Sequence, residues 1–150
     1  MQTRRETLKH SAAVAGLLAS TGLFPQYAQA FEKAAFDAKS VADALKAYGG
    51  GAPTASDAVT LTAPDIAENG AVVPISVTSN VPGTEKIAIL VEKNPNPLSA
   101  RITLPAGTEP TITTRVKMAG TSNVHALVQA NGKWLIATKE IKVTLGGCGG

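Results

Sequence analysis

Between Asp57 and Leu145 the sequence alternates apolar and polar residues in short runs, and this pattern limits the chain to a fold built from strands. Val, Ile and Thr are dense in these runs and favour strands. Turn-forming residues separate the runs, and Asn131-Gly132 is typical of a type I′ hairpin turn. The predicted strands cover residues 59–63, 72–79, 86–92, 100–104, 111–118, 123–130 and 133–145. The pattern predicts a mainly β fold, an immunoglobulin-like antiparallel β-sandwich.

A helical pattern precedes the strands. From Phe31 to Tyr48, apolar residues recur at three- and four-residue spacing and form one face, with charged residues mostly on the other. Gly49-Gly50-Gly51 and Pro53 then stop the helix. We expect one N-terminal helix over residues 31–48, packed either on the sandwich or on a partner protein.

Residues 1–30 have the features of an export signal. A basic start precedes a short apolar run, and Ala28-Gln29-Ala30 is a small-x-small cleavage site. The run is too short and too weakly apolar to span a bilayer, so no membrane association is predicted. Arg4 and Arg5 lie in a twin-arginine motif that departs from the usual pattern only at Thr7, where Phe is common. These features predict a periplasmic protein, exported by the twin-arginine route and beginning at Phe31.

Charge and composition exclude several classes of function. The chain has a formal net charge of +3, and removal of residues 1–30 brings it near +1, because three basic residues and one acidic residue leave with them. No basic stripe with interleaved aromatic residues is present, so nucleic-acid binding is not expected. Since the twin-arginine route carries folded proteins and no cofactor motif is present, we expect a partner subunit to assemble with this chain before export.

The remaining sequence offers no self-contained catalytic equipment. His125 lies in the middle of a predicted strand and is interpreted as a strand-face or core residue. Trp134, at the start of the last strand, is interpreted mainly as a packing residue. The acidic residues are dispersed, and no paired spacing of metal ligands or phosphate-binding loop is present. We therefore predict no catalytic residue, no metal site and no cofactor.

The only cysteine, Cys148, stands near the end of the chain between two pairs of glycines, Gly146-Gly147 and Gly149-Gly150. A single cysteine cannot form an intramolecular disulfide, and an unpaired one in an exported protein suggests an intermolecular bond or a working thiol. Glycine leaves the sulfur uncrowded and the backbone permissive. Residues 146–150, called the C-terminal arm below, are predicted to be a flexible segment that presents this thiol to other proteins. Residues 31–145 are predicted to form the domain that carries it.

The export signal, the helix, the predicted sandwich and the terminal Gly-Gly-Cys-Gly-Gly together resemble the SoxY family of the periplasmic Sox sulfur-oxidation system. The resemblance implies a substrate carrier rather than an enzyme, with a thiosulfate-derived adduct covalently attached to Cys148. It implies pairing with a SoxZ-like subunit in a heterodimer or heterotetramer. It also implies that SoxAX-, SoxB- and sulfane-dehydrogenase-like enzymes act on the sulfur bound to this protein. A disulfide dimer through Cys148 is a further implication.

Three alternatives stay open. A ubiquitin-like sulfur carrier also ends in Gly-Gly, but its activation uses ATP, and seven strands are too many for that fold. An exported metal-binding module would use Cys148, His125 and Met118 as ligands. A structural β-sandwich subunit would use Cys148 only to link dimers.

Overall fold

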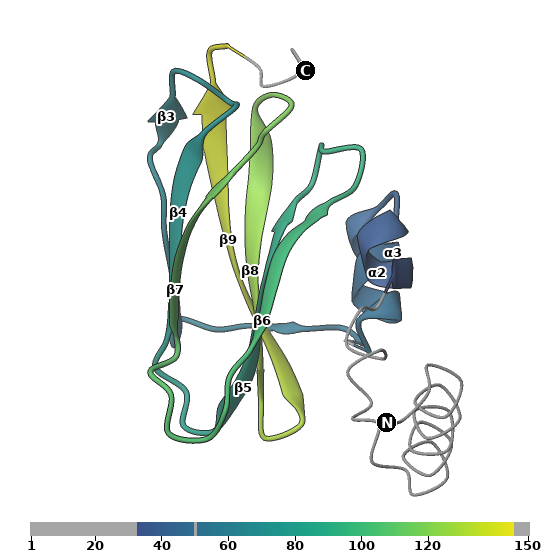
Figure 1. The fold of residues 1–150 in the computed structure, drawn as a ribbon, viewed down its shortest axis with the longest axis vertical. Helices are drawn as coiled ribbons and strands as arrows, with labels where there is room; N and C mark the ends of the chain where they lie inside the picture. Colours follow the sequence, from purple (N-terminus) through teal and green to yellow (C-terminus); the bar gives the residue numbers. More distant parts are fainter. Residues whose placement is uncertain (1–32, 50, 146–150) are drawn as a thin grey trace, which may run out of the picture. The chain divides into compact units, whose positions relative to one another are not determined.

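A computed structural model describes residues 33–49 and 51–145, and in these residues two β-sheets face each other (Figure 1). One sheet contains β2 (Val59–Thr62), β4 (Val73–Ser79) and β7 (Thr111–Val116), paired antiparallel in the order β2-β4-β7. The other has the order β1-β9-β8-β5-β6. Its strands are β1 (Thr54–Ala55), β5 (Thr84–Val91), β6 (Leu98–Thr103), β8 (Ser122–Ala130) and β9 (Lys133–Val143), and β3 (Ile66–Ala67) also pairs with β9. The predicted fold class, a mainly β sandwich, is confirmed.

The core between the two sheets follows from the alternation in sequence. In β4, Val73, Ile75 and Val77 are buried, whereas the residues between them are more exposed. They pack against inward residues of the other sheet, among them Ile87 and Ile141, in one apolar cluster. Because side chains of a strand point alternately to opposite faces, this two-residue period commits one face of each sheet to the core.

All seven predicted strands are present, with ends within two residues of those expected. The predicted hairpin turn between β8 and β9 is confirmed as well, because Asn131 (φ 49°) and Gly132 (φ 73°) both have positive φ. The sequence pattern missed β1 and β3, the two short strands that pair parallel with β9. Each has only two residues, which is too short for alternation to be detected.

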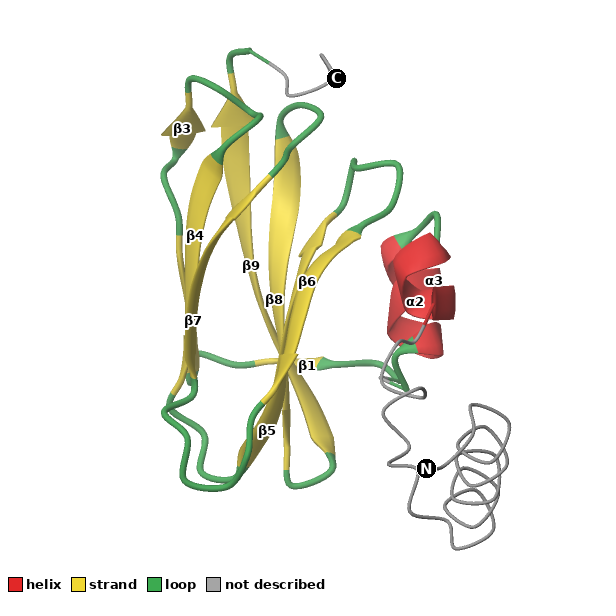
Figure 2. Ribbon diagram, viewed as in Figure 1, coloured by secondary structure: helices red, strands yellow, loops and turns green. Residues whose placement is uncertain are grey.

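The prediction of one helix over residues 31–48 is wrong in the described part of that range, which contains two helices, α2 (Lys33–Asp37) and α3 (Val41–Ala47) (Figure 2). Ser40 interrupts the helix with an extended backbone (φ −136°, ψ 158°), and its hydroxyl accepts a hydrogen bond from the Asp43 N–H at 3.1 Å. Serine is a favoured N-cap, because its oxygen satisfies an N–H of the first turn.

The break also changes which residues of the helical segment are buried. Ala42, placed on the apolar face by the continuous pattern, is exposed, and Ala44 is buried instead. Together with Ala35 and Tyr48, Ala44 packs on Leu127 and its neighbours on the outer face of the β1-containing sheet. The described helices therefore pack on the sandwich, one of the two possibilities left open by the sequence.

Candidate functional site

Strand β9 precedes the C-terminal arm. Its inner face packs in the core, and its outer face is covered at the end farther from the arm, whereas Thr138, Glu140 and Lys142 are exposed. Leu135, Ile141 and Val143 pack in the core between the sheets, whereas Trp134 and Ile136 pack against the helix cluster on the other side. This division follows from the alternation of side chains along the strand. Side-chain packing thus fixes the inner face of β9 up to Val143, and the outer face at the start of the strand.

Backbone hydrogen bonds hold the last residues of β9 and the two that follow it. The partners belong to residues 65–70, which include β3. The bonds are Lys142 N to Asp65 O (2.9 Å), Thr144 N to Ala67 O (3.1 Å) and Gly70 N to Leu145 O (2.8 Å), and the Thr144 hydroxyl donates to Glu68 O (3.1 Å). The chain therefore has a defined position up to the residue immediately before the arm.

Two further hydrogen bonds connect the end of β9 and Gly70 to residues between β7 and β8. The Val143 N–H donates to Thr121 Oγ1 at 2.9 Å, and Met118 N donates to Gly70 O at 2.7 Å. Gly70 thus links the end of β9 to the segment that follows β7, which belongs to the other sheet. Sequence analysis missed this arrangement. The only local signal for it is Asn69-Gly70, a turn-forming pair that by itself indicates no more than a turn between strands.

The predicted site residues themselves lie outside the described residues. These are Cys148 and the arm glycines Gly146, Gly147, Gly149 and Gly150, together with the export residues Arg4 and Arg5. Covalent geometry still limits where Cys148 can be: three residues beyond Leu145, its Cα lies at most about 10 Å from the Leu145 Cα. The surface around Leu145 is therefore the part of the described domain that any protein handling Cys148 must approach.

His125 lies on the outer face of β8, as the strand-face interpretation expects. Its Nδ1 lies 2.8 Å from Thr138 Oγ1, and its Nε2 lies 3.7 Å from Glu92 Oε2. Burial lowers the pKa of His125 below its ordinary value, and the nearby Glu92 carboxylate partly opposes this shift. Met118, the other described ligand of the metal-binding alternative, is fully buried in the core between the sheets. The structure therefore does not bring these two side chains together as a metal site.

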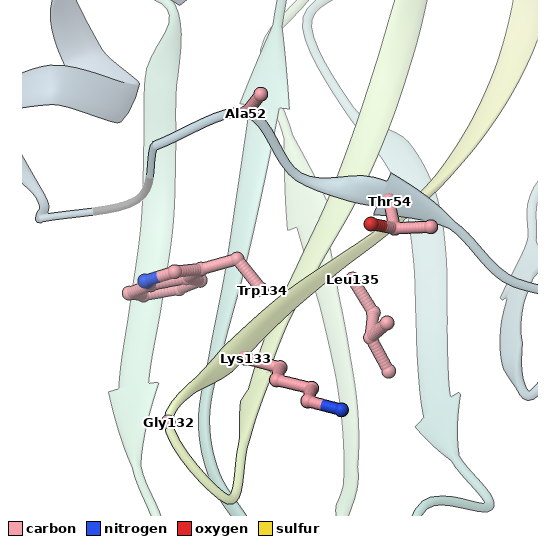
Figure 3. A pocket seen from close by; sticks show the side chains of 6 residues that line it. All are labelled: Ala52, Thr54, Gly132, Lys133, Trp134 and Leu135. Atoms are coloured by element: carbon pink, nitrogen blue, oxygen red, sulfur yellow. The ribbon is translucent and has the colours of Figure 1, made fainter.

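Trp134 packs as expected, at the far end of β9 from the arm. Its ring lies 5.0 Å from the Tyr48 ring, and its Nε1–H donates to Gly49 O at 3.1 Å. A hollow of about 480 Å³ lies beside it (Figure 3). The hollow is lined by Ala52, Thr54, Gly132, Lys133, Trp134 and Leu135. Because β9 runs from Lys133 to Val143, this hollow and the start of the arm are at opposite ends of the strand.

Within residues 33–49 and 51–145, no group of three or more His, Cys, Asp or Glu is arranged to hold a metal ion. In the same residues, no helix is long and apolar enough to cross a membrane. The described fold and site define a β-sandwich whose last strand is held firmly at the point where a short cysteine-containing segment begins.

The comparisons with known proteins identify the family. The family described as "Sulfur oxidation protein SoxY" matches residues 44–148, so the chain belongs to the SoxY family. A similar solved structure is that of the sulfur carrier protein SoxY from Chlorobium limicola f thiosulfatophilum. It is 39% identical, with a TM-score of 0.63 over 69% of this chain and 94% of that one. Comparison with curated proteins found no match. Family and neighbour together support a sulfur-carrier role in sulfur oxidation, alongside other proteins of the Sox system.

Proposed function

We propose that this protein is a covalent carrier that holds a thiosulfate-derived adduct on Cys148 and presents it to partner enzymes. The observation that carries the proposal is the extent of the family match, which runs to residue 148 and so includes the cysteine. The hydrogen bonds at the end of β9 support the proposal, because they fix the backbone at Leu145, three residues before the cysteine.

The chemistry needs a thiolate, which is the nucleophilic form of cysteine. Loading joins Cys148 Sγ to the sulfane sulfur of thiosulfate in a new S–S bond, with release of the thiol proton and two electrons. A SoxAX-like cytochrome pair accepts those electrons. A SoxB-like enzyme then hydrolyses the terminal sulfone to sulfate, and a sulfane-dehydrogenase-like enzyme oxidises the sulfur that stays bound. This chain acts as the substrate-bearing protein in each step.

The proposal includes the assembly and location expected from the sequence. The chain pairs with a SoxZ-like subunit, is exported by the twin-arginine route through Arg4 and Arg5, and works in the periplasm. Without its partners, the Cys148 thiols of two copies can be oxidised to a disulfide by an oxidant such as dioxygen, which accepts the two electrons while two protons are released.

Replacement of Cys148 by Ser tests the function directly. In a reaction reconstituted from the mature chain, the SoxZ-like subunit and the partner enzymes, Cys148→Ser is expected to abolish sulfate release from thiosulfate. Its melting temperature and its pairing with the SoxZ-like subunit should not change. Sulfate release at the wild-type rate would instead favour the structural alternative, in which Cys148 only links dimers.

A further inference from the structure

Large apolar side chains are exposed at one end of the described domain. In the described residues these are Ile66 (58% exposed), Val72 (53%) and Leu145 (66%), called the apolar rim below. Ile66 lies in β3, Val72 immediately precedes β4, and Leu145 follows β9. Figure 1 shows the β3 region, the start of β4 and the end of β9 at the same end of the sandwich. β3 and the start of β4 thus lie at the end of the sandwich where β9 ends and the arm begins.

Hydrogen bonds hold the rim residues together. The bond from Gly70 N to Leu145 O joins the segment between Ile66 and Val72 to the end of β9, and Val72 N donates to Asn69 O at 3.4 Å. Alternation explains why Ile66 and Val72 point away from the core, since the next residues, Ala67 and Val73, are buried in it. Leu145 is exposed because it lies two residues beyond the end of β9. The rim residues therefore contribute little to the core, and their exposure leaves apolar surface in water.

Charged residues surround the rim. Lys142 pairs in register with Ile66, and Glu68 lies between Ile66 and Val72; both are exposed. Asp65 is also exposed, and its carboxylate lies 2.9 Å from Lys139 Nζ. An apolar centre with charged residues at its edge is the usual composition of a surface that binds another protein transiently.

The short distance along the chain between Leu145 and Cys148 indicates which proteins contact the apolar rim. An enzyme that acts on the Cys148 sulfur must reach a residue whose Cα lies within about 10 Å of the Leu145 Cα, so we expect its active-site entrance to approach the rim. We propose that Ile66, Val72 and Leu145 dock against an apolar collar around the active-site entrance of the enzymes that process Cys148. This inference rests on the proposed carrier function and adds the surface that positions the enzyme.

The test replaces two rim residues that lie outside the arm. Ile66→Thr combined with Val72→Thr makes the rim polar and leaves the arm and Leu145 unchanged. The control is Val81→Thr, which makes the same Val-to-Thr change in the loop that follows β4, at the opposite end of that strand. The mature chain with its SoxZ-like subunit is loaded with thiosulfate at Cys148, and sulfate release by a SoxB-like enzyme is measured against carrier concentration.

We expect the double variant to raise KM about tenfold, the loss typical of truncating a central contact, with kcat unchanged. Val81→Thr should match the wild type. The reaction of Cys148 with a small disulfide reagent and the affinity for the SoxZ-like subunit should be the same for all three proteins.

Three results would overturn the inference. An unchanged KM would mean that the enzyme does not use the rim. Faster reaction with the small reagent in the double variant would indicate that the arm itself covers the rim, and weaker pairing would indicate that the SoxZ-like subunit does. Failure of the carrier function is distinguishable from all of these, because loaded wild-type protein would then release no sulfate.

Discussion

His125 is held in a small polar network on a face of the sheet that is otherwise apolar near the helices. Thr138 contacts one ring nitrogen, Glu92 lies near the other, and Asn123 Nδ2 donates to the same Glu92 oxygen at 2.9 Å. Only 14% of the His125 side chain is exposed, so loss of hydration outweighs the attraction of the Glu92 carboxylate. The folded chain therefore favours neutral imidazole and has a lowered His125 pKa.

The lowered pKa of His125 predicts that the stability of the folded chain depends on pH. Above about pH 6.5, the ordinary pKa of histidine, His125 is neutral in both the folded and the unfolded chain and has no effect. As the pH falls from about 6.5 toward the lowered pKa, the unfolded chain binds the proton first, so the free energy of unfolding decreases. Since residues 31–150 contain no other histidine, an NMR titration of the imidazole of the mature chain measures the pKa directly.

Two variants check the cause of this shift. Glu92→Gln should lower the His125 pKa further, because it removes the opposing charge. His125→Gln should weaken the loss of stability between about pH 6.5 and the titration midpoint. An imidazole pKa at or above 6.5 in the wild-type protein would contradict this account.

At the scale of elements, the end of β9 depends on partners that are distant in sequence. Thr121 is one of them, since its hydroxyl oxygen accepts the Val143 N–H at 2.9 Å. This bond lies two residues before Leu145, so it helps to fix the point from which the arm starts. Its loss leaves a partly buried N–H without its acceptor, which typically costs about 1–3 kcal/mol.

We therefore predict that Thr121→Val lowers the free energy of unfolding by about 1–2 kcal/mol. Hydrogen exchange at the Val143 amide should become faster. Thr113→Val is the matched control, because Thr113 is exposed and its hydroxyl lies 3.0 Å from Ser76 Oγ, so the substitution should change stability by less than about 0.5 kcal/mol. Equal effects of the two substitutions would mean that the Thr121 bond does not secure the end of β9.

Whether an element could be predicted from the sequence depends on whether it has a local sequence pattern. The seven long strands and the Asn131-Gly132 turn were predictable, because each has a local pattern of alternation or turn chemistry. Ser40 was also visible, but the regular apolar spacing on both sides concealed its role as a cap. β3 and its bonds to β9 could not be predicted, because two residues carry no period and the pairing joins segments about 75 residues apart.

At the scale of the whole molecule, a β-sandwich precedes a short segment that contains Cys148, the residue that we propose carries the sulfur substrate. Cys148 could be singled out from the sequence, because its glycine neighbours and terminal position are local features. The surface next to it could not, because the pairing of β3 with β9 and the bond from Gly70 N to Leu145 O join segments that are distant in sequence.

If the arm must enter a narrow active site, bulk beside the sulfur should block loading. Gly147→Trp and Gly149→Trp are each expected to reduce enzymatic loading of Cys148 at least tenfold, because a large side chain clashes with the channel. The melting temperature should stay within about 3 °C of the wild type, because substitutions away from packed or bonded groups usually change stability by less than about 0.5 kcal/mol. A marked loss of stability would indicate that the arm packs against the domain.

The most direct test of the carrier account is the intact mass of the mature protein, purified from its native periplasm after growth on thiosulfate, with and without reductant. The account predicts added mass of sulfur or thiosulfate on the peptide that contains Cys148, lost on reduction, together with a co-purifying SoxZ-like subunit. A bare Cys148 thiol, with no adduct and no partner under these conditions, would contradict it.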